Sequence, residues 1–241
     1  WITHMGWSLM GDAISHSILP GVVISHLLGL PYLVGALVFA LITVILVGRV
    51  KKSQIVKPDT AIGIVFTTFF ALGTVLISKV PSQINLSHIL FGNLLGVTVP
   101  DMLQVLLIGL PIALVLVLKN RDLTLLAFDP THAQAIGLSV RWLTSLLLIA
   151  LALAIVISLQ AVGVILSVSL LIVPGACARL LTNRMRHMLW ISPLIAIVSV
   201  LVGITGSYYF DASSGGMIGL TLGIIFCIIF VIRSLPSVGR V

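Results

Sequence analysis

The chain is organised around one apolar stretch that carries an acid and a histidine, Gly11-Asp12-Ala13-Ile14-Ser15-His16-Ser17-Ile18-Leu19-Pro20-Gly21. A helix brings positions i and i+4 onto one face, with their Cβ atoms roughly 6 Å apart. Asp12 and His16 should therefore point the same way. Ionisable side chains inside hydrocarbon are costly, and those that occur usually serve an ion or proton path. The pair predicts such a path, although a helix cap at Asp12 and a core hydrogen bond at His16 would also explain it.

The composition indicates that this stretch lies in a membrane. Of the 241 residues, 59% are hydrophobic and only 8% are charged, and the mean hydropathy is +1.28. Such a chain has too little polar surface to cover a soluble globule. Its acidic residues are all Asp, and its net charge of +7 suggests basic cytoplasmic loops before nucleic-acid binding. We therefore expect contact with a lipid bilayer and none with nucleic acid.

Apolar runs of about 20 residues predict eight transmembrane helices. The expected fold is thus an all-α, polytopic membrane helix bundle that forms a single domain over residues 1–241. Every Lys and Arg except Lys79 falls on one side of this arrangement, and the positive-inside rule makes that side, with the C-terminus, cytoplasmic. The runs lie near residues 8–29, 32–48, 58–79, 101–118, 142–159, 161–181, 189–209 and 216–232.

Four further residues are candidates for the pathway or its support. Pro20 and Gly21 break the first predicted span one turn after His16, and transporters hold their substrates at discontinuous spans. His26 would lie about 15 Å further along the helix than His16, too far to share one ion, so we expect a packing histidine with a satisfied ring. Asp59 is expected to be the N-cap of the helix that follows Pro58.

The segment 124–140 differs from the spans because it is cytoplasmic and only moderately apolar. Asp129 as N-cap and Pro130 at the first helical position predict a short helix there. Two interpretations stay open. The helix could lie on the membrane surface, or it could dock on a cytosolic partner, with Ala133 and Gly137 permitting close approach.

Four motifs that follow one another along the chain resemble the permease subunits of bacterial ABC importers for manganese, iron and zinc. The similarity covers nearly the whole chain, and the first motif is the most specific. The third motif, which runs from Phe91 to Gly96, is also predicted to form a short re-entrant turn near the outer surface. The motifs are the run from Ser8 to Gly21, Asp59-Thr60-Ala61-Ile62-Gly63-Ile64, Phe91-Gly92-Asn93-Leu94-Leu95-Gly96, and the run from Phe128-Asp129-Pro130 to Gly137.

The resemblance implies a membrane-embedded permease in the bacterial inner membrane. It implies that Asp12 and His16 are intramembrane metal ligands. Besides the bilayer, it implies three kinds of protein partner: cytosolic ATPase subunits, a second permease copy or paralogue, and an extracytoplasmic metal-binding protein. Because the family carries its metal pair on a span that follows another, one more N-terminal helix is expected in the natural protein. The segment that would couple to the ATPase contains Phe128, Asp129, Ala133 and Gly137.

The chemistry of the pair agrees with this resemblance. One carboxylate and one imidazole per chain, doubled across a two-fold axis, make a mixed oxygen and nitrogen set that suits manganese, iron or zinc. The metal is then cargo, and no resident cofactor is expected. The chain lacks a Gly-x-x-x-x-Gly-Lys-Ser/Thr loop, so ATP hydrolysis is assigned to a partner and the chain is not expected to be an enzyme.

Two other functions were weighed against transport by an ABC permease. A secondary ion carrier could use Asp12 and His16 as a proton relay, and it would need no docking helix. A membrane-embedded protease is disfavoured, because the chain has no Glu for His-Glu-x-x-His and no Gly-x-Ser-x-Gly motif.

Overall fold

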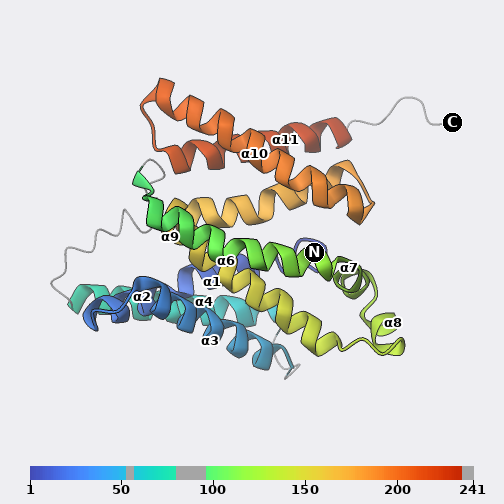
Figure 1. Ribbon diagram of the computed structural model, residues 1–241, viewed down its shortest axis with the longest axis horizontal. Helices are drawn as coiled ribbons and strands as arrows, with labels where there is room; N and C mark the ends of the chain where they lie inside the picture. The colour runs from blue at the N-terminus through green and yellow to red at the C-terminus, as the bar shows by residue number, and fades with distance from the viewer. Residues whose placement is uncertain (53–56, 80–95, 235–241) are drawn as a thin grey trace. The chain divides into compact units, whose positions relative to one another are not determined.

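The computed structural model describes residues 1–52, 57–79 and 96–234, and within these ranges every regular element is a helix. The expected all-α fold is therefore confirmed (Figure 1). The helices are α1 (Ser8–Ser17), α2 (Leu19–Leu27), α3 (Tyr32–Lys52), α4 (Pro58–Lys79), α6 (Val99–Leu118), α7 (Asn120–Phe128), α8 (Pro130–Ala135), α9 (Val140–Leu181), α10 (Met185–Phe210) and α11 (Ser214–Ser234).

The eight predicted spans correspond closely to these helices. Across the described ranges, 7 segments are long and apolar enough to cross a membrane, and two of them are the halves of α9. The remaining predicted span, 8–29, is the pair α1 and α2, each too short to cross a bilayer alone. The polytopic bundle with about eight spans is thus confirmed.

The sequence predicted a break in the first span at Pro20-Gly21. In the structure the break lies at Ile18. Pro20 is the second residue of α2. The displacement has a simple cause, since proline lacks the N–H that would bond to the carbonyl four residues earlier, here that of His16. The helical pattern is therefore disturbed on the turn before the ring. Backbone N–H groups at the end of α1 still satisfy the carbonyls of His16 and Ile14.

Two other predictions from the sequence concern Asp59 and the run Phe91–Gly96. Asp59 is not the N-cap of α4, because the helix already begins at Pro58 and Asp59 lies in its first turn. A carboxylate there still interacts favourably with the helix dipole. The re-entrant turn predicted at Phe91–Gly96 lies, for residues 91–95, outside the residues that the structure describes.

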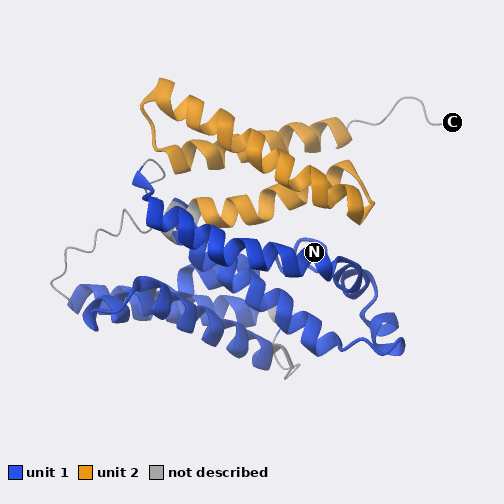
Figure 2. Cartoon of the chain, viewed as in Figure 1, with its two compact units in different colours: residues 1–164 blue, residues 165–241 orange. Residues whose placement is uncertain are grey.

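The helices form two compact units, residues 1–164 and 165–241 (Figure 2). In the first unit α1 and α2 pack on α3 and α4. In the second unit α10 packs on α11, so closely that a Cβ on Gly203 would lie 2.6 Å from the Cα of Ile218. Helix α9 crosses the boundary and is kinked at Gly163, whose φ is +77°. The single permease domain over residues 1–241 stays a prediction.

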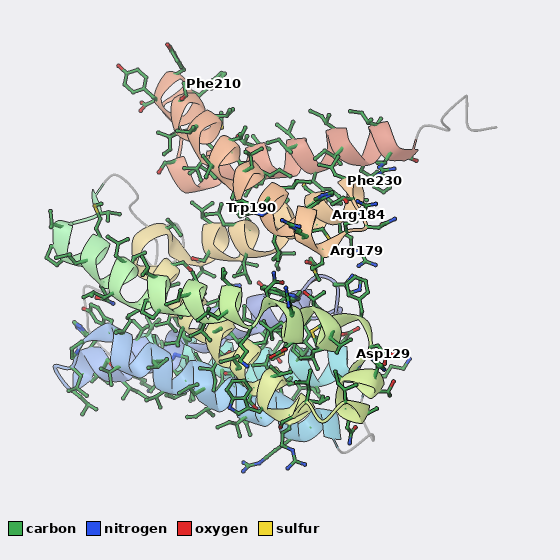
Figure 3. The ribbon with its side chains drawn as sticks, turned by 45° about the vertical axis from the view of Figure 1, so that its right-hand side comes forward. Asp129, Arg179, Arg184, Trp190, Phe210 and Phe230 are labelled. Atoms are coloured by element: carbon green, nitrogen blue, oxygen red, sulfur yellow. The ribbon has the colours of Figure 1, made fainter. Side chains whose placement is uncertain are left out.

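Helix α10 shows the side-chain distribution of a membrane span. Trp190 near its start and Tyr208, Tyr209 and Phe210 at its end are all more than 70% exposed. Figure 3 labels Trp190 and Phe210. Trp190 and Tyr208 are about 27 Å apart along the axis, which is close to the thickness of a hydrocarbon core. Aromatic residues favour the two membrane interfaces. The exposed apolar surface between them therefore faces lipid or another helix in the bilayer.

Candidate functional site

Asp12 and His16 lie side by side on α1. The Oδ1 of Asp12 is 3.5 Å from the Nε2 of His16. Two ligand atoms that each bind one ion at about 2.1 Å with tetrahedral geometry are about 3.4 Å apart. The pair is therefore placed to share one ion without a change in the backbone.

From Met10 to Ser17, the pair is also the accessible part of α1, and before it Leu9 is 50% exposed. The side chain of Asp12 is 46% exposed and that of His16 is 23% exposed. The other residues along the middle of α1 are buried, so the helix presents to its surroundings one narrow face that carries both ligands. The buried residues are Met10, Gly11, Ala13, Ile14, Ser15 and Ser17.

Two aromatic residues of α4 hold the imidazole of His16. Its ring centroid lies 5.1 Å from that of Phe66 and 5.5 Å from that of Phe70, both with edge-on geometry. Such aromatic contacts prefer defined ring orientations, so they restrict the rotation of the His16 side chain. Neither phenylalanine was among the candidate residues predicted from the sequence. Their i, i+4 spacing was the available signal, because it places both rings on one face of α4.

The described residues of one chain supply at most two side-chain ligands to this site. Within residues 1–52, 57–79 and 96–234, no group of three or more His, Cys, Asp or Glu could hold a metal ion. Stable protein sites for divalent transition metals use three or four protein ligands. Any further ligands must therefore reach the exposed side of Asp12 from elsewhere.

The residues predicted to support the pathway have mainly structural contacts. Pro20 and Gly21 are buried, and Gly21 meets Gly35 of α3 so closely that a Cβ on either would overlap the carbonyl oxygen of the other. The hydroxyl of Ser25 accepts a hydrogen bond of 3.0 Å from the N–H of Gly35 at the same crossing. His26 is exposed, and its Nδ1 lies 3.0 Å from the hydroxyl of Tyr32.

The predicted short helix after Phe128 is confirmed as α8, with Asp129 as its N-cap (Figure 3). The Oδ1 of Asp129 accepts hydrogen bonds from the hydroxyl of Thr131, at 2.5 Å, and from the N–H of His132, at 2.9 Å. These two bonds, the hydroxyl first, lower the pKa of the Asp129 carboxyl. Because this pKa is lowered, the stabilisation by the cap is complete at pH values above the ordinary pKa of Asp. It is lost only as the pH falls through the lowered pKa.

Helix α8 ends in a Schellman motif at Gly137. The N–H of Leu138 bonds to the carbonyl of Ala133 at 3.0 Å, and that of Gly137 bonds to the carbonyl of Gln134 at 3.1 Å. Gly137 has a φ of +86°, which explains the glycine by backbone conformation. Ala133 is fully buried, so its side chain packs within the chain itself and is not available for close approach by a partner. Phe128 and Ile136 are instead the apolar side chains exposed here.

We expect Gly137→Ala to weaken attachment of a cytosolic partner by straining the end of α8. Residues other than glycine pay roughly 1 kcal/mol or more at positive φ. Gly29→Ala is a matched control, because Gly29 also has a positive φ, +66°, and at both positions an added Cβ would meet nothing within 4 Å. Co-purification with the ATPase subunits that the resemblance implies measures the effect. Equal retention of the partner by the two variants would contradict a docking role for this turn.

Comparison with known proteins shows the family of this chain. The model of a family described as the ABC 3 transport family matches residues 1–233. The manganese transport system membrane protein MntB of Synechocystis sp. is 47% identical over 228 residues, which are 95% of this chain and 74% of that protein. A probable iron transport system membrane protein of Haemophilus influenzae is 46% identical over 92% of this chain and 82% of that protein.

A solved structure shows the same fold. PsaBC from Streptococcus pneumoniae, in complex with Fab, has a chain that matches with a TM-score of 0.85 at 40% sequence identity. The match covers 95% of this chain and 83% of that chain. The resemblance stated from the motifs is therefore confirmed. The chain belongs to the ABC 3 transport family and is a multi-pass bacterial membrane permease.

Proposed function

We propose that this permease carries a divalent transition metal into the cell and that Asp12 and His16 are its ligands for the cargo. The observation that carries the proposal is the 3.5 Å separation of their ligand atoms on the accessible face of α1. Manganese is the favoured cargo, because relatives at 42–47% identity include several manganese transport proteins. Iron, named for other relatives at similar identity, and zinc are the alternatives.

The ligand types support this cargo class. An imidazole nitrogen is a poor ligand for magnesium and calcium, which prefer oxygen ligands. Copper(I) prefers sulfur ligands, and the pair contains none. Two ligands from one chain also hold an ion weakly, which suits a protein that must release what it binds.

We propose that a second permease, identical or paralogous, completes the site. Its own Asp and His would bring the ligand number from two to four. The exposed side chain of Asp12 leaves room for a metal bridge to that second chain. This arrangement would surround the ion only while the two permeases stay together.

Two further kinds of partner follow from the same proposal. Cytosolic ATPase subunits would dock on the exposed residues around α8, including Phe128 and Asp129, and would hydrolyse the ATP. An extracytoplasmic metal-binding protein would deliver the metal. Basic residues lie at the end of α9 and the start of α10, among them Arg179 and Arg184 (Figure 3). By the positive-inside rule they support a cytoplasmic location for that end. The C-terminus after α11 would then also be cytoplasmic.

The decisive experiment measures uptake of manganese, iron and zinc, side by side, into proteoliposomes that contain the complete transporter. We expect ATP-dependent uptake of at least one of these metals, with manganese fastest, and no uptake of magnesium. Uptake that continues without the ATPase and follows a proton gradient would instead establish a secondary carrier. Absence of uptake for all three metals by an assembled, ATP-hydrolysing complex would overturn the proposed cargo.

A further inference from the structure

The residues before α1 pack on the short helix α7 as well as on the membrane helix α9. Buried Leu123 and Leu126 of α7 form an apolar cluster with Leu143 and Leu147 of α9. The N-terminal segment (Trp1–Trp7) covers this cluster with four partly buried side chains, which are those of Trp1, Ile2, Met5 and Trp7.

Two specific contacts tie the N-terminal segment to α7. The indole N–H of Trp1 donates a hydrogen bond of 3.3 Å to the hydroxyl of Thr124. The ring of His4 lies 4.1 Å, centroid to centroid, from that of Phe128. Phe128 is the last residue of α7 and directly precedes Asp129, the N-cap of α8. The contact therefore reaches the edge of the segment that would dock the ATPase.

Backbone hydrogen bonds join the N-terminal segment to α1, the helix that carries the ligand pair. Backbone hydrogen bonds run from the N–H of Met5 to the carbonyl of Trp1, from Trp7 to Ile2, and from Met10 to Trp7, at 2.9 to 3.0 Å. Trp7 immediately precedes α1. Asp12 follows Trp7 by little more than one helical turn, about 7.5 Å along the axis. A displacement of the N-terminal segment would thus move Asp12 and His16 with it.

One ring nitrogen of His4 lacks a hydrogen-bond partner within the described residues. This nitrogen, Nδ1, is buried and forms no hydrogen bond with any residue that the structure describes. A buried polar atom without a partner raises the free energy of the arrangement that contains it. Within the described residues, no hydrogen bond of Nδ1 holds His4 in place, so its position against Phe128 rests on the ring contact.

We propose that the N-terminal segment is a mechanical link that transmits movement of the ATPase-docking segment to the ligand pair, with His4 as the positioning residue at the contact. This inference rests on the proposed function, since it assumes an ATPase partner and a metal cargo. It adds a route between them that runs from α8 through Phe128 and His4 to α1. The route lies within the first unit and uses no contact with the second.

The test compares His4→Ala with His4→Phe in the complete transporter, with His187→Ala as control, because His187 is an exposed histidine at the start of α10. The measured quantity is the number of ATP molecules hydrolysed per metal ion transported. His4→Ala should raise this ratio about 5-fold or more, with unchanged assembly and unchanged hydrolysis in the absence of metal. His4→Phe keeps a ring against Phe128 and should stay near the wild-type ratio, as should the control.

A second variant guards against failure of His4→Ala to assemble. Thr124→Val removes the acceptor for the Trp1 indole with little change in volume, and it should raise the ratio in the same direction by a smaller factor. An unchanged ratio in assembled His4→Ala, or in Thr124→Val where His4→Ala does not assemble, overturns the link. A loss of coupling in His4→Phe as large as that in His4→Ala also overturns it, because the ring contact would then not matter. If the wild-type complex transports no metal, it is the proposed function that fails.

Discussion

Asp12→Ala is expected to abolish metal uptake, and His16→Ala is expected to reduce it severely. A hydrated divalent ion that enters a path of low dielectric constant loses water at a large cost in free energy. That cost is acceptable only where ligand oxygen and nitrogen atoms replace the hydration shell. On the described surface of α1, the Asp12 carboxylate and the His16 imidazole are the side chains that can do so.

Radiolabelled uptake into proteoliposomes measures this effect, once each variant is shown to assemble at the wild-type level. His26→Ala serves as control for loss of a histidine, because the ring of His26 pairs with Tyr32 and not with Asp12. Its uptake should fall only slightly. Near wild-type uptake of every metal by the Asp12→Ala, His16→Ala double variant would show that the metal passes elsewhere.

Gly35→Ala and Gly21→Ala are expected to destabilise the permease itself. At each position the added Cβ would overlap a backbone carbonyl of the other helix, and a backbone atom cannot move aside as the end of a side chain can. The helices α2 and α3 would have to separate, which would also weaken the hydrogen bond between Gly35 and Ser25. Overpacking of this kind costs roughly 1–3 kcal/mol.

Thermal unfolding in detergent measures this loss, with an expected decrease of about 2–4 °C in Tm for each kcal/mol. Gly48→Ala is the matched control, because Gly48 lies on the same helix α3 and an added Cβ there would meet nothing within 4 Å. A Tm for Gly35→Ala equal to that of Gly48→Ala would show that the two helices do not cross at these glycines.

The candidate site illustrates how far local sequence rules extend. The i, i+4 spacing was enough to place Asp12 and His16 together, because the spacing of a helix is set by its backbone. Asp129 was likewise predicted as an N-cap, since the cap and its partners are neighbours in the chain. With Asp59 as N-cap, the start of α4 was predicted two residues too late, because the exact end of a helix is weakly specified by its local sequence.

By itself, the sequence determined that this protein is an all-helical membrane protein with about eight spans, and which two side chains form its ionisable pair. Hydropathy and helical periodicity are properties of short segments, so they need no tertiary contacts. Only the tertiary structure decided that Phe66 and Phe70 flank His16, that Gly21 crosses Gly35, and that His4 lies against Phe128. These pairs are far apart in the chain, and their contacts depend on how the helices pack, which the pattern of any one helix does not specify.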